Sequence, residues 1–146
     1  ALVGTTRNVE ANVTGATVVP FLWTAAGHTV SASSIVFLAK IPHGAHVTRF
    51  DAVGWVGNAD NSTIDVGFTG EASLDYLVDG AAVSATATAV LTVRTGALPH
   101  FISLSDDTQP RFRYLQAKWA SLGTATTTAI IAGVIEYVMG KPTIGR

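Results

Sequence analysis

Residues 83–94 read VSATATAVLTVR, the most regular pattern in the chain. Every second residue is Val, Ala or Leu, and most of the residues between are Ser or Thr. Because strand side chains point alternately to two faces, this period of two is typical of a half-buried β-strand. A helix would scatter the threonines over its surface, and β-branched residues disfavour helices. We therefore expect one long strand here. Its buried face would carry Val83, Ala85, Ala87, Ala89, Leu91 and Val93.

Six further segments have the composition of strands, and Gly or Pro marks the loops between them. Ile64, Val66 and Phe68 alternate with less apolar residues after the turn-rich residues 57–62. Residues 47–56, before that turn, are rich in β-formers, so the two runs predict a hairpin. Only residues 72–82 could hold a short helical turn. The other expected strands are residues 34–41, 101–104, 111–119 and 126–138.

These elements predict an all-β, single-domain β-sandwich that is jelly-roll-like or Greek-key. A chain of 146 residues fits one domain with a sizeable core. Residues 1–27 and 139–146 combine Gly and Pro with scattered apolar or charged residues. We therefore expect an N-terminal arm over residues 1–27, a sandwich over 28–138 and a C-terminal arm over 139–146.

Two of the expected strands, residues 34–41 and 126–138, carry apolar side chains on both alternating faces. Strands with this pattern are covered on both sides. In a small two-layer protein the second cover must come from an arm, a second copy or another protein. The pattern thus predicts assembly.

Composition excludes several classes of function. Charged residues make up 13% of the chain, against roughly 25% in typical soluble domains. The net charge is −1 and no basic cluster is present, so we expect no nucleic-acid partner. The chain has no cysteine, no signal peptide and no apolar run of membrane-spanning length, so we expect no membrane partner. The initial Ala1 is consistent with removal of a starting Met, and we expect synthesis in the cytoplasm.

Residues that could perform chemistry do not cluster in the sequence. His43 and His46 flank a turn without a carboxylate or further histidine at ligand spacing, so we expect no metal. Most acidic residues lie in or beside predicted loops, where turn-forming Asp is the default. No phosphate loop or nucleophile elbow is present. We therefore expect no enzymatic activity and no cofactor.

One apolar triplet, Phe21, Leu22 and Trp23, lies in the expected N-terminal arm. An apolar triplet outside the strand core must be buried somewhere, and aromatic anchors are enriched at interfaces. We expect these three residues to contact a partner protein, with Arg7 and Arg146 as polar contacts nearby.

Three segments resemble a pattern of small tailed-phage virion proteins. They are IPHGAHV at residues 41–47, IDVGFTG at 64–70 followed by DYL at 75–77, and IEY at 135–137. The sequence departs from this pattern at Glu71, Ala72 and Ser73, where the family more often has an Asp-Pro-like turn. The resemblance implies a jelly-roll-type cementing protein with extended arms and self-association.

With the fold and the hints of assembly, this resemblance implies a structural virion protein on the capsid exterior, made in the host bacterial cytoplasm. Its expected partners are the major capsid protein and further copies of itself, as a dimer or trimer. The alternative is a carbohydrate-binding or adhesin-like sandwich on a virion, with exposed Trp and Asp/Asn loops forming the site.

Overall fold

The computed structural model describes residues 16–57, 62–71, 73–84, 88–103, 111–123 and 125–139. These residues form nine β-strands, and none of them is helical. The strands are β1 (Ala16–Thr24), β2 (Ile35–Pro42), β3 (Ala45–Val56), β4 (Ser62–Phe68), β5 (Val78–Val83), β6 (Ala89–Val90), β7 (His100–Phe101), β8 (Phe112–Leu122) and β9 (Ala129–Met139). The predictions of an all-β chain and of strands matching β2, β8 and β9 are confirmed.

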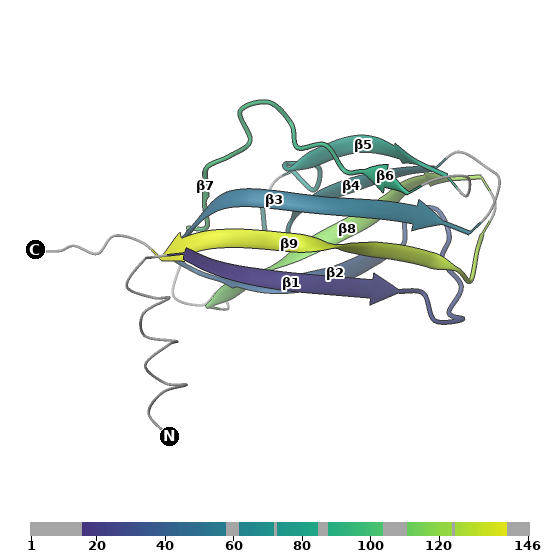
Figure 1. The fold of residues 1–146 in the computed structure, drawn as a ribbon, viewed down its shortest axis with the longest axis horizontal. Helices are drawn as coiled ribbons and strands as arrows, with labels where there is room; N and C mark the ends of the chain where they lie inside the picture. The colour runs from purple at the N-terminus through teal and green to yellow at the C-terminus, as the bar shows by residue number, and fades with distance from the viewer. Residues whose placement is uncertain are drawn as a thin grey trace, which may run out of the picture.

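The strands form two antiparallel sheets that pack face to face (Figure 1). One sheet has the order β1-β9-β3-β6, with β7 also paired to β3, and the other has the order β2-β8-β4-β5. Strands far apart in sequence therefore pair, namely β1 with β9, β2 with β8, and β3 with β6 and β7, and the consecutive strands β4 and β5 form the innermost pair. Nesting of antiparallel pairs in this order is the winding of a jelly roll.

The core lies between the sheets and comes from alternate residues of each long strand. In β3 the buried residues include Val47, Phe50 and Val56, and in β4 they include Ile64 and Val66. The largest side chain with no exposed surface is Trp119 on β8. Period-two patterning thus places one face of each strand in the core, as the sequence predicts.

The expected hairpin between residues 47–56 and 63–68 is wrong. Both strands form, as β3 and β4, but they lie in opposite sheets. Each strand has one buried face, and that pattern is the same whether two strands pair side by side or face each other across a core. Alternation therefore could not distinguish the two arrangements.

The single long strand expected over residues 83–94 is also wrong. β5 ends at Val83 in one sheet, and β6, at Ala89 and Val90, belongs to the other. The chain crosses the sandwich here, so the alternation continues although the strand does not: Val83 and Leu91 are buried and Val90 is 70% exposed. Ala85 and Ala87 lie outside the described residues. The described part of residues 72–82, where a short helical turn was possible, contains no helix, and β5 begins there at Val78.

The expected boundary at residue 28 needs correction, because β1 belongs to the sandwich. All nine residues from Ala16 to Thr24 pair with β9. Irregular apolar spacing around Pro20 obscured this strand in the sequence, but proline is compatible with a strand at the edge of a sheet. β2, at the corresponding edge of the other sheet, contains a bulge between Phe37 and Ala39. Residues 1–15 and 140–146 lie outside the described residues.

Candidate functional site

We call the outer face of the β1-β9-β3-β6 sheet the front face. It is formed by residues that alternate with the core residues of the same strands. The register places Leu22 of β1 beside Ala132 of β9, Ala132 beside Val53 of β3, and Val53 beside Val90 of β6. One apolar row thus crosses the whole sheet, and a parallel row contains Ile130 beside Trp55.

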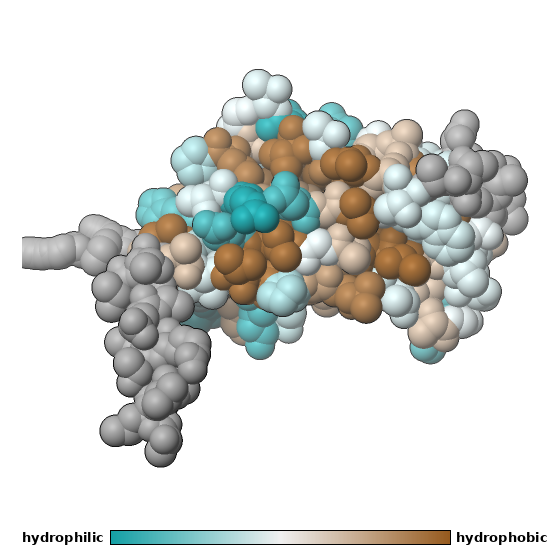
Figure 2. All heavy atoms as spheres, in the orientation of Figure 1, coloured by the Kyte–Doolittle hydropathy of each residue, from teal (hydrophilic) through white to brown (hydrophobic). Residues whose placement is uncertain are grey.

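Large apolar side chains are exposed across the front face. Figure 2 shows apolar residues spread over this side of the molecule around a hydrophilic cluster. Leu22 and Val90 are each 70% exposed, far more than the core residues beside them in sequence. The other large apolar residues exposed on this face are Val18, Phe101 and Ile130.

Three charged residues form an ion-paired group within the front face. The Nε of Arg49 lies 2.5 Å from Oδ2 of Asp51, and its Nη1 lies 3.3 Å from Oε1 of Glu136. These contacts raise the pKa of Arg49 above its ordinary value, mainly through the hydrogen bond to Asp51. One guanidinium serves two carboxylates, so the group carries a net charge of −1.

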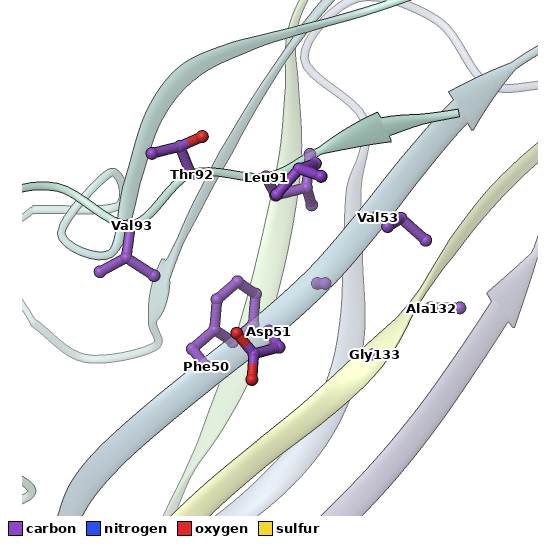
Figure 3. Close-up of a pocket in the computed structure, with 10 residues that line it drawn as sticks. Phe50, Asp51, Val53, Leu91, Thr92, Val93, Ala132 and Gly133 are labelled. Carbon is purple, nitrogen blue, oxygen red and sulfur yellow. The ribbon is translucent and has the colours of Figure 1, made fainter. Parts of the chain in front are cut away.

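A depression of about 730 Å³ lies beside this charged group, between β3, β9 and residues 90–93. We call it the front hollow (Figure 3). It opens because β6 pairs with β3 only at Val53 and Gly54, while β7 pairs with β3 near its other end. Its lining is Phe50, Asp51, Ala52, Val53, Val90, Leu91, Thr92, Val93, Ala132 and Gly133. Asp51 is the one charged residue in this lining.

The structure separates the residues expected at an interface. Leu22 points outward on the front face, whereas Phe21 is only 8% exposed and stacks on Phe50 in the core. Trp23 also points inward, is partly buried, and its ring lies 6.3 Å from that of Trp119. Arg7 and Arg146 lie outside the described residues.

A second polar group lies at one end of the sandwich and is largely buried. Glu71 lies 2.9 Å from Nε2 of His100 and 3.9 Å from Nε of Arg113. Nη1 of Arg113 donates to the carbonyl oxygen of Thr69 at 2.8 Å. Burial, with Arg113 and Arg111 nearby, lowers the pKa of His43. These side chains join loops to each other, so we assign them a structural role.

The outer face of the other sheet, the back face, carries an aromatic cluster. Phe37 is 56% exposed and stacks on Tyr114 with ring centroids 4.6 Å apart. Nζ of Lys40 lies 4.3 Å from the ring centroid of Phe112.

The described residues contain no group of three His, Asp or Glu side chains placed to hold a metal ion. Within the same residues, no helix is long and apolar enough to cross a membrane.

Two solved structures contain chains with this fold. One is in the capsid asymmetric unit of cyanophage Pam1, with a TM-score of 0.62 and 16% identity over 86% of this chain and 87% of that one. The other is in the capsid of Ralstonia phage GP4, with a TM-score of 0.58 and 20% identity over 87% and 86%. No protein-family model and no curated protein matches the chain. At these identities the likeness is one of fold.

Sequence reasoning missed the charged group and the front hollow. Arg49, Asp51 and Val53 alternate along β3 in the sequence, which places them on one face. Glu136 is more than eighty positions away, and only the β3–β9 register brings it opposite Arg49. The gap between β6 and β7 depends on tertiary structure, so no local signal could have revealed it.

Proposed function

We propose that this chain is a non-enzymatic structural virion protein that binds the outside of a phage capsid and cements its major capsid subunits. The observation that carries this proposal is the front face, an apolar sheet surface that no described part of the chain covers. Large contiguous apolar patches on soluble proteins mark interaction sites. The fold shared with chains of two phage capsids supports a place in the virion.

Energetics favour a partner on this face. Burying an exposed Leu, Val or Ile side chain contributes about 1.5–3 kcal/mol. Leu22 and Val90 stand at opposite ends of one cross-strand row and both are mostly exposed. A partner that covers the row would bury both.

We also propose self-association, which the resemblance to cementing proteins first indicated. Ala16 and Val138 are paired, so the chain enters and leaves the sandwich at the same end. Arg7 precedes Ala16 in the sequence and Arg146 follows Val138, and we propose both as polar contacts to a partner. We propose Leu22 as the apolar contact to the partner. Trp23 points inward and packs beneath this surface near Trp119.

Co-sedimentation with phage shells that lack this protein tests the function. The wild-type chain should pellet with the shells, and Leu22→Asp should reduce the pelleted fraction at least about tenfold because a buried unpaired charge is costly. Phe37→Asp is the matched control, since it adds the same charge at an exposed apolar position of the back face. If the wild-type chain stays in the supernatant, the proposal is wrong.

The glycan-binding alternative loses two of its three possible tryptophan platforms. An exposed Trp was the predicted platform, but Trp119 is fully buried and Trp23 is partly buried in the core. Trp55 is partly exposed on the front face, and the Asp/Asn loops at residues 58–61 and 104–110 lie outside the described residues. No observation favours carbohydrate binding over capsid binding, so we do not propose it.

A further inference from the structure

We propose that the front hollow receives a lysine or arginine side chain from a capsid subunit, and that the Asp51 carboxylate binds the cationic group of that side chain. This inference rests on the proposed capsid binding and specifies the chemistry of the contact.

The walls of the front hollow suit the aliphatic part of such a side chain. Val53 of β3 and Ala132 of β9 line it from the sheet, and Val90 and Val93 line it from the segment of residues 90–93. Lysine and arginine bury their methylene groups along apolar surface while the charged end reaches a polar group. Asp51 is the one charged group in the lining, and its side chain is 64% exposed, so it is open to an incoming cation.

Charge balance on the front face points to the same partner. Arg49 already bridges Asp51 and Glu136, and among the described residues no second cation compensates the remaining negative charge. Covering this group with a purely apolar surface would remove the charge from water without a partner, which is strongly unfavourable. A cation from the capsid subunit would restore neutrality and use the second oxygen of Asp51, since the Arg49 contact uses only Oδ2.

The same balance disfavours a second copy as the occupant. Two front faces packed together would bring four carboxylates against two guanidinium groups, leaving two uncompensated charges between apolar surfaces. Like charges brought together across an interface cost several kcal/mol and suppress wrong pairings. A capsid subunit with a basic side chain within an apolar surface avoids this cost.

Binding to phage shells that lack this protein, measured across a range of salt concentrations, tests the inference. Asp51→Asn should weaken binding at least about tenfold and reduce the dependence of binding on salt. Glu136→Gln is the matched control: it removes a carboxylate from the same ion-paired group but outside the hollow, so its effect should be smaller. Ala132→Leu fills the hollow without changing charge and should also weaken binding. Thermal unfolding of each variant confirms that it is folded.

The outcomes separate this inference from the proposed function. If wild-type protein does not bind shells, the proposed function itself fails. If wild-type protein binds and Asp51→Asn binds equally well or more tightly, the proposed function stands, and the inference that Asp51 binds a cation in the front hollow is wrong. If Asp51→Asn or Ala132→Leu instead changes the self-association seen in analytical ultracentrifugation, a second copy occupies the hollow and the inference is overturned.

Discussion

The ring of Phe21 on β1 stacks on the ring of Phe50 on β3, with centroids 6.0 Å apart, although β9 lies between the two strands. Gly133 explains the contact. It is the residue of β9 opposite Phe21, and its other neighbour is Ala52. A glycine at this inward position leaves the space between the two rings free of side chains.

Gly133→Ala should destabilise the fold. A Cβ at this position would lie 2.1 Å from the carbonyl oxygen of Asp51 and 2.6 Å from Cα of Ala52, and neither backbone atom can move alone. Overpacking of this kind costs about 1–3 kcal/mol, which urea unfolding would measure. Ala132→Ser, at the adjacent outward position, should change stability by less than about 0.5 kcal/mol. Equal stability of the two variants would contradict the packing described for β9.

Phe21→Ala should lower the free energy of unfolding by about 3 kcal/mol, because a buried aromatic side chain leaves a cavity. Leu22→Ala, one position along, should leave stability within about 0.5 kcal/mol of wild type, because Leu22 is on the outer face. Calorimetry on both variants compares the two faces of β1. A larger loss for Leu22→Ala would show that β1 faces the other way.

The contrast between these neighbours shows what the sequence could predict. The triplet at residues 21–23 identified a segment whose apolar side chains need burial, and that part of the reasoning stands for Phe21 and Trp23. The strand that pairs with this segment could not be predicted, because β1 pairs with β9, more than one hundred positions away in the sequence. Long-range register decides whether such a segment covers its own core or a neighbour.

Arg113→Leu should destabilise the end of the sandwich that carries Glu71 and His100. The guanidinium is nearly buried and donates to the carbonyl oxygens of Thr69 and Ser103. Leucine would leave these acceptors without that donor, at a cost of about 1–3 kcal/mol. Urea unfolding measures the loss. Stability equal to wild type would mean that water satisfies the carbonyl groups fully.

Stability should fall as pH decreases below about 6.5, the ordinary pKa of histidine, and His43 should contribute to this fall. The pKa of His43 is lowered in the folded state, so the unfolded chain binds its proton more tightly. Its contribution is present in full above pH 6.5 and is lost as the pH falls toward the folded-state pKa. His43→Gln should flatten the plot of unfolding free energy against pH between about 5 and 7. An unchanged slope would assign the dependence to other groups.

The candidate site was less predictable than the fold. Residues 126–138 have apolar side chains on both faces, and β9 indeed exposes Ile130 on the front face while burying Ile131. The pattern correctly indicated apolar side chains on both faces of this strand, and the cover that it predicts for the outer face stays a prediction. It could not indicate which charges lie within the surface, because Arg49 and Glu136 meet only through the β3–β9 pairing, whose register shifts between Val47 and Arg49.

Pro20 affects whether another copy of the chain can add a strand to the edge of the sheet at β1. Unpaired backbone groups along a sheet edge promote strand-by-strand addition of further chains, which leads to aggregation. Pro20 removes one donor from the middle of β1, and the bulge in β2 interrupts the matching edge of the other sheet. Strand-by-strand addition of further copies is therefore disfavoured at these two edges, β1 of one sheet and β2 of the other.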